Sequence, residues 1–149
     1  MIPLAAVTGL DAPDGALDAL NSLHTLTIDS RNGFEKMVDK AEPEFRPVVE
    51  RFRSLHHRQA GDLAAILAKR GHAVEDGGSM MGTLNEAVVS LRSFFDDIDE
   101  GTMPSIRRGE EHVLNAYAEA LRHPLGPDEA LQISSMRDDL VALLAASPV

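Results

Sequence analysis

The stretch that decides the fold is FRPVVERFRSLHHRQAGDLAAILAKR, residues 45–70. Its apolar side chains recur at steps of three and four residues, which is the spacing of one face of an α-helix. Lys69 and Arg70 suit the carboxyl end of a helix, and Gly71 suits the position just past it. We therefore expect a helix that ends near Arg70. Its inward face carries Phe45, Val48, Phe52, Leu55, His56, Gln59, Leu63, Ile66 and Leu67.

Amphipathic helices of the same kind are expected on both sides of this stretch. One precedes it over residues 15–41 and is closed by Pro43, because proline disfavours helix in the residue before it. Three follow, over about 80–98, 102–122 and 127–146. No segment alternates like a strand, and the connections are short. Short loops between long amphipathic helices place neighbours antiparallel in a bundle, so the predicted fold class is all-α.

The length of 149 residues is that of one domain. Residues 1–14 are mildly apolar but contain no lysine or arginine, and Gly9 and Pro13 interrupt them. A secretory signal has a basic start and a longer apolar stretch, and a membrane span needs about 20 apolar residues. We therefore expect an N-terminal arm at residues 1–14 and a single helical-bundle domain at residues 15–146.

Composition narrows the class of function. The chain has no cysteine, which excludes a disulfide framework, a thiolate zinc site and a cysteine nucleophile. The absence of cysteine also fits a reducing compartment, and we expect a cytoplasmic protein. The formal net charge of −10 argues against binding to nucleic acid or to an anionic membrane surface. As a partner we expect a second copy of the chain, in a homo-oligomer that is a dimer.

Three motifs follow one another in a characteristic order. They are LNSLHTLTIDSRNGF at residues 20–34, the run from Asp62 through Gly71 to Ser79, and RGEE at 108–111 followed by Asn115–Tyr117 and Ala120–Leu121. In this order they resemble an uncharacterised bacterial family of ferritin-like four-helix-bundle proteins, a domain of unknown function, over roughly residues 16–145.

The resemblance implies a ferritin-like four-helix bundle with an additional crossover helix. The first two helices would form one antiparallel pair and the last two the other. The middle helix, about 80–98, would lie along the crossover between the pairs. A shared fold does not fix an activity, so the resemblance leaves the function open.

The resemblance raises the question of a di-iron centre. Such a centre takes one Glu from each of two helices and a Glu-x-x-His pair from each of the other two. Three residues before His56 and His57 stand Arg53 and Ser54, and the last histidine of the chain, His123, precedes the fifth helix. Both Glu-x-x-His pairs are therefore absent. The residues that can still be drawn into a metal site are Glu35, His56 and Glu110.

The same residues also have an interpretation without a metal. A histidine on the apolar face of a helix is expected to be a core residue hydrogen-bonded to a neighbour. Glu110, on the stripe between Ile106 and Val113, is expected to pair with an arginine. His56 and His57 point about 100° apart on a helix, so the two rings do not form a chelate. The plausible arginine partners of Glu110 are Arg31, Arg53 and Arg107.

Two functions from different classes remain. The chain lacks the nucleotide-binding glycine motifs, the HExxH pair of zinc proteases and the GxSxG nucleophile elbow. The first candidate is a non-catalytic bundle without a cofactor, which acts by assembly or by binding a partner. Its ferritin-like relatives suggest a role in stress physiology. The alternative is an iron-binding or di-iron oxidase-type protein with a degenerate metal site. The missing Glu-x-x-His pairs favour the first.

Overall fold

A computed structural model describes residues 2–74 and 98–148, with side chains from Gly15 onward. In this part of the chain four α-helices form: α1 (Ile2–Lys40), α2 (Arg46–Lys69), α4 (Met103–Leu121) and α5 (Pro127–Ala146). A short 3-10 helix, η1 (Glu100–Thr102), precedes α4. The described residues contain no strand, which confirms the all-α prediction for them. The expected middle helix lies outside the described residues apart from Ile98.

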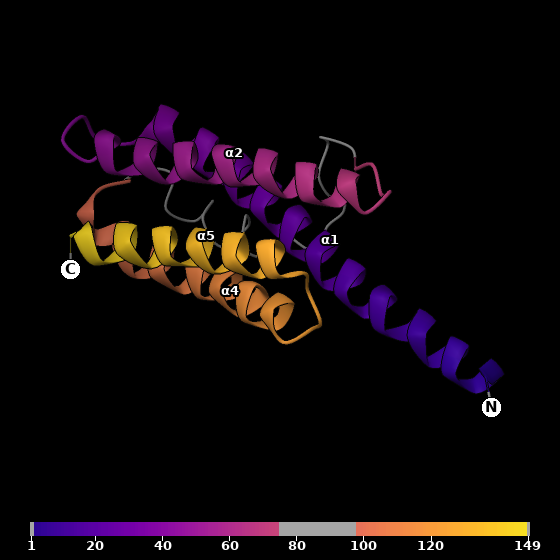
Figure 1. Cartoon of the computed structure of the whole chain (residues 1–149). Coiled ribbons are helices and arrows are strands. Elements are labelled where there is room, and N and C mark those ends of the chain that lie inside the picture. The colour runs from indigo at the N-terminus through magenta and orange to yellow at the C-terminus, as the bar shows by residue number, and fades with distance from the viewer. Residues whose placement is uncertain (1, 75–97, 149) are drawn as a thin grey trace.

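The helices pack as a bundle (Figure 1). α1 lies along α2, and α4 lies along α5, in the pairs that the family resemblance implies. Contacts of α1 with α4 and of α2 with α5 join the two pairs. Within each pair the helices run in opposite directions, because the connections between them are short (Figure 1).

The helix ends follow local signals in the sequence. Gly71 has a φ of 84°, a left-handed conformation that only a residue without a Cβ adopts readily. Its N–H donates to the Ala68 carbonyl and the N–H of His72 donates to the Leu67 carbonyl, both at 2.9 Å, so α2 ends in a Schellman motif. Pro127 opens α5 in the first turn, where its missing N–H costs nothing.

The start of α1 differs from the prediction. The helix begins at Ile2, not near residue 15, and it runs through Gly9 and Pro13 without a break. Pro13 has a φ compatible with a helix but no N–H to donate, so α1 has one backbone hydrogen bond fewer at this point. A Cβ at Gly15 would lie 3.1 Å from His123 Nδ1, which places the end of α4 against α1 at this point. Residues 2–14, which we call the arm, extend past the other helices (Figure 1).

Ile98 does not belong to a helix, although the sequence stripe placed it at the end of one. It forms a parallel bridge with Ala41, and its carbonyl accepts a hydrogen bond of 2.9 Å from the N–H of Glu42. Asp99 then caps η1, since its Oδ1 accepts from the N–H of Gly101 at 2.9 Å. This short bridge ties the α1–α2 turn to the start of α4.

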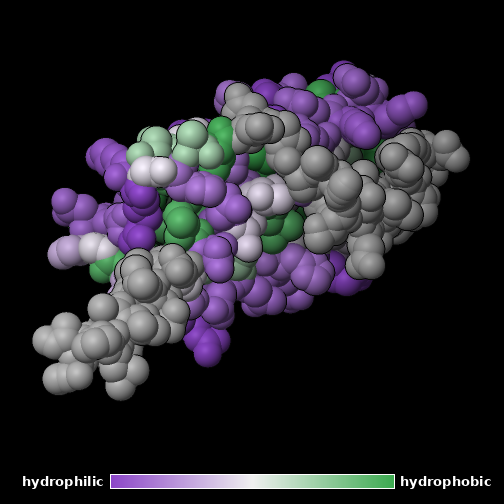
Figure 2. Space-filling model, turned by 90° about the vertical axis from the view of Figure 1, so that its right-hand side faces the viewer, coloured by the Kyte–Doolittle hydropathy of each residue, from purple (hydrophilic) through white to green (hydrophobic). Residues whose placement is uncertain are grey.

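The core is built from the inward faces of all four helices. On the face shown in Figure 2, the coloured residues are mostly hydrophilic, with hydrophobic ones between them. Among the described residues, no helix is both long and apolar enough to cross a bilayer. In the part of the chain whose side chains the structure describes, the largest fully buried ones are Tyr117, Phe52, Leu20, Leu23, Ile28, Met37, Leu63, Leu67, Ile98, Met103, Ile133 and Leu140.

Candidate functional site: a buried histidine–glutamate pair

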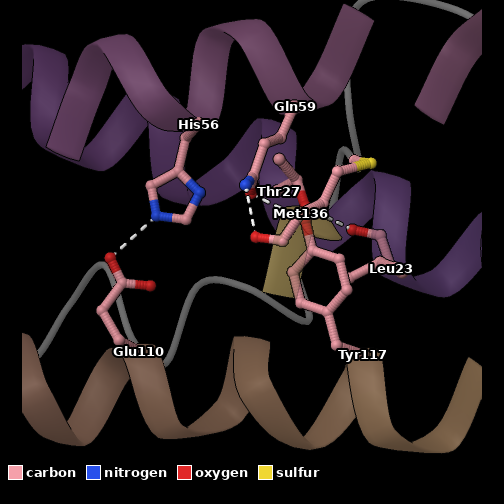
Figure 3. Close-up of polar contacts among 7 residues, drawn as sticks. All are labelled: Leu23, Thr27, His56, Gln59, Glu110, Tyr117 and Met136. Carbon is pink, nitrogen blue, oxygen red and sulfur yellow. Dashed lines mark hydrogen bonds and ion pairs between the residues drawn. The ribbon is translucent and has the colours of Figure 1, made fainter. Parts of the chain in front are cut away.

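The core contains an acidic and a basic side chain in direct contact. His56 of α2 and Glu110 of α4 meet across the bundle, with 2.7 Å between Nε2 and Oε2 (Figure 3). The two side chains are 0% and 2% exposed. Phe34 of α1 stacks on the imidazole with ring centroids 5.6 Å apart, and Phe52 stacks on Phe34 at 5.2 Å. The pair is therefore enclosed by three helices and shielded from water.

Helical spacing explains why these two residues point inward. His56 lies four residues after Phe52 and seven before Leu63, so all three share the buried face of α2. Glu110 lies four residues after Ile106 and three before Val113 on the buried face of α4. This confirms the expectation of a core histidine that is hydrogen-bonded to a neighbour.

The pair leaves two polar atoms unused. Within the described residues, neither Nδ1 of His56 nor Oε1 of Glu110 has a hydrogen-bond partner. A buried carboxylate is costly unless it is paired, and a buried polar atom that lacks a partner costs about 1–3 kcal/mol. Nε2 and Oε2 therefore compensate each other, while Nδ1 and Oε1 have no partner among the described residues.

A second set of polar contacts lies beside the first (Figure 3). Tyr117 of α4 donates its hydroxyl hydrogen to Oε1 of Gln59 at 2.6 Å. Gln59 of α2 in turn donates from Nε2 to the main-chain carbonyl of Met136 in α5 at 2.8 Å. Burial raises the pKa of Tyr117, and the charge of Glu110 adds to the effect. The phenol thus stays a neutral donor, and the contacts join α2, α4 and α5.

We call these four side chains, His56, Gln59, Glu110 and Tyr117, the polar seam. All four lie at helical spacing from the apolar residues of α2 and α4, but the sequence assigned no role to Gln59 or Tyr117. The signal that could have found them is the spacing of polar residues within an apolar stripe. His56 and Gln59 are three residues apart, and Glu110 and Tyr117 are seven apart, so each helix presents two polar groups on one face.

The expected arginine partners of Glu110 are engaged elsewhere, so that prediction was wrong. Arg31 donates to Oδ1 of its neighbour Asn32, and Arg53 pairs with Glu50 at 3.2 Å. Arg107 donates to carbonyls near the end of the chain, including that of Pro148 at 2.8 Å. A long guanidinium side chain keeps its charge near water, whereas the short imidazole fits between packed helices.

The three candidate metal ligands are not brought together. His56 and Glu110 are in contact, but Glu35 is exposed on α1, and His57 is exposed on α2. Among the described residues, no three His, Cys, Asp or Glu side chains are grouped closely enough to hold a metal ion. A histidine and a single carboxylate do not supply the ligands of a ferritin-like di-iron centre, so the described residues do not fit that group.

Comparison with known proteins identifies a family. No curated protein and no solved structure matches the chain. One family model matches residues 15–123, a range that contains α2 and α4 and therefore the whole polar seam. The chain belongs to the family described as a domain of unknown function, DUF2383.

Proposed function

We propose that this chain is a non-catalytic, ferritin-like four-helix-bundle protein with a crossover helix and no cofactor. It acts in the cytoplasm by assembly into a homodimer or by binding a protein partner, in the context of stress physiology. It binds neither nucleic acid nor membrane, for which its net charge of −10 is unsuited.

The observation that carries this proposal is the contact between His56 and Glu110. In a ferritin-like metal centre, the inward carboxylates and imidazoles bind metal. Here the nearest such groups bind each other at 2.7 Å, and Gln59 and Tyr117 extend the same seam with uncharged groups. A seam of this kind holds helices in register, which is a structural role. Such a core suits a protein that acts by binding other molecules through its surface.

One observation favours the alternative, an iron-binding or di-iron oxidase-type protein with a degenerate site. Nδ1 of His56 and Oε1 of Glu110 have no partner within the described residues. Both atoms are potential metal ligands, and a metal would have to draw its remaining ligands from elsewhere. The lack of a third grouped ligand among the described residues weighs against this alternative.

Metal analysis separates the two functions. Protein purified without a chelator should contain far less than one iron per chain, and ferrous iron or zinc should raise its melting temperature little, since no preformed site rewards binding. About two irons per chain, the stoichiometry of a di-iron centre, would overturn the proposal. A metal-dependent rise of many degrees in the melting temperature, lost in both His56→Ala and Glu110→Gln, would also overturn the proposal.

Assembly is tested by the mass of the protein in solution. Light scattering should give twice the chain mass of 16.1 kDa, independent of added metal. A mass of one chain at all concentrations would contradict the homodimer.

A further inference from the structure

The last helix, α5, is the least deeply buried of the three helices whose side chains are all described. It buries Ile133, Met136 and Leu140, whereas α4 buries six side chains and α2 buries ten. It also carries Leu131 and Val141, which are 72% and 47% exposed. The family match ends at residue 123, before α5 begins. The last helix therefore joins the bundle through one narrow apolar stripe.

α2 and α4 hold α5 at three points along its length. At its amino end, Arg70 of α2 donates two hydrogen bonds to Glu129, of 2.8 and 2.7 Å. In its middle, Gln59 donates to the main-chain carbonyl of Met136 at 2.8 Å (Figure 3). At its carboxyl end, Arg107 of α4 donates to three main-chain carbonyls in the last turn and just beyond it, at 3.1, 3.3 and 2.8 Å. We call Arg70, Gln59 and Arg107, with the surfaces of α2 and α4 between them, the α5 site.

The contacts of the α5 site define the kind of helix that it accepts. Gln59 and Arg107 bind main-chain carbonyls, so they recognise a helix and its carboxyl end whatever the side chains are. The side chains are recognised by Arg70, which binds a carboxylate, and by the apolar surface of the site.

The apolar residues of α5 complete the pattern. Ile133, Met136 and Leu140 lie four, seven and eleven positions after Glu129. Residues at these steps share one face of a helix, which is the usual way in which a groove recognises a helix. The α5 site therefore fits a helix that has an acidic residue and, four, seven and eleven positions later, apolar residues.

We propose that α5 is a displaceable occupant of this site, and that a helix of a partner protein with the same pattern binds there in its place. This inference rests on the partner binding proposed above and names its site. The loop of residues 122–126 keeps α5 near the site, at an effective concentration on the order of millimolar for a short linker. The partner helix binds in competition with α5, so α5 controls access to the site.

A peptide competition in the full chain tests the proposal. The probe is a fluorescent peptide with the sequence of residues 127–148, and its anisotropy measures binding. Ile133→Asp with Leu140→Asp in the chain should release α5, because buried carboxylates without partners are costly, and it leaves α2 and α4 unchanged. This variant should bind the peptide at least about tenfold more tightly than the wild type, whose site is filled by its own α5. Equal binding by the two chains would overturn the proposal.

A matched control places the same charges on the other side of α5. Leu131→Asp with Val141→Asp, at exposed positions, should leave α5 in its site, so this chain should bind the peptide no better than the wild type does. A peptide that itself carries Ile133→Asp and Leu140→Asp should not bind the released variant. Binding of that peptide with undiminished affinity would mean that the site does not recognise the apolar stripe, which would contradict the proposal.

Hydrogen exchange of the wild-type chain tests displacement without a peptide. The amides of α5 should exchange faster than those on the buried faces of α2 and α4, because α5 opens while the other helices stay folded. Glu129→Gln, which weakens the bonds to Arg70, should speed exchange in α5 and leave α2 and α4 unchanged. A common exchange rate in all three helices would show that α5 opens only when the whole chain unfolds. That result would overturn the proposal, as would global unfolding of the variant with Ile133→Asp and Leu140→Asp.

The outcomes separate this inference from the proposed function. A peptide that does not bind the released variant overturns the α5 site and leaves the assembly measured by light scattering unaffected. Conversion of a wild-type dimer into single chains by the peptide would assign the site to α5 of a second copy and overturn the partner helix. A wild-type mass of one chain at all concentrations contradicts the homodimer, while tight peptide binding by the released variant would still support the α5 site.

Discussion

Glu110 of α4 and His56 of α2 are separated by 54 positions in the chain and joined by one hydrogen bond of 2.7 Å in the core. Each residue removes the cost of burying the other, so the pair functions as a unit. Removing one partner of a buried pair leaves an uncompensated polar group, whereas an isosteric amide keeps the hydrogen bond. The relationship therefore predicts very different effects for two substitutions at the same position.

Glu110→Gln should fold with a loss of at most about 1 kcal/mol, because the side-chain amide oxygen still accepts a hydrogen bond from His56. Glu110→Ala should lose about 3 kcal/mol, because it leaves the imidazole buried without a partner and opens a small cavity. Urea unfolding of both variants measures the difference. Equal losses in the two variants would show that shape, and not the hydrogen bond, determines stability at this position.

Tyr117 offers a spectroscopic test, since it is the only tyrosine in the chain and there is no tryptophan. Burial raises the pKa of Tyr117 in the folded state, so the folded protein keeps the phenol neutral at about pH 10, where the phenol of the unfolded chain ionises. The contribution of the neutral phenol to the free energy of unfolding is therefore fully present below about pH 10. It falls as the pH rises above this value. Absorbance at the phenolate wavelength should rise together with unfolding measured by circular dichroism. A phenolate signal that appears well before unfolding would contradict a buried neutral phenol.

Tyr117→Phe isolates the hydroxyl from the ring. It removes the donor to Gln59 and leaves Oε1 of that residue buried without a partner, so we expect a loss of about 1–2 kcal/mol. A matched control is Thr27→Val on α1, which removes another buried hydroxyl, one whose hydrogen bond goes only to the Leu23 carbonyl within its own helix. Urea unfolding should show the larger loss for Tyr117→Phe. The reverse order would mean that the contact between α2 and α4 contributes little.

The sequence predicted the elements whose ends have local signals. Gly71 after α2 and Pro127 at the start of α5 are such signals, and both boundaries were confirmed. The sequence did not predict the contacts that depend on residues far apart in the chain. The partner of Glu110 depends on how α2 and α4 are rotated toward each other, and no spacing within one helix contains that information. Ile98 likewise needed the approach of Ala41, more than fifty residues away, to form its bridge.

Phe52 lies on the buried face of α2, so we expect its truncation to destabilise the protein. Its side chain is fully buried and stacks on Phe34, so Phe52→Ala should cost roughly 3–5 kcal/mol as a large-to-small change in the core. Lys69→Gln, at an exposed position on the same helix, should stay within roughly 0.5 kcal/mol. Similar midpoints for both variants in urea would contradict the assignment of the buried face.

Arg70 and Glu129 tie the end of α2 to the start of α5 through two hydrogen bonds, of 2.8 Å from Nε to Oε2 and of 2.7 Å from the other guanidinium nitrogen to Oε1. The hydrogen bonds from Arg70 lower the pKa of Glu129 below its usual range. A carboxylate whose pKa is lowered on folding stabilises the fold above its unfolded pKa, and this contribution disappears as the pH falls through the folded pKa. Arg70→Met keeps the capping bond from the N–H of Gly126 to Glu129 and removes only the pair.

We therefore expect Arg70→Met to be less stable than the wild type by about 1 kcal/mol at pH 7, since the pair is partly exposed and screened by solvent. The difference should shrink toward zero as the pH falls below about 4, where Glu129 loses its charge. Urea unfolding of both proteins from pH 7 to pH 3 measures it. Arg122→Met, whose ion pair with Glu119 is largely exposed, is the matched control and should show little difference at either pH. A deficit in Arg70→Met that is the same at pH 7 and pH 3 would mean that the arginine stabilises the helix junction by packing its aliphatic chain and not by its bond to Glu129.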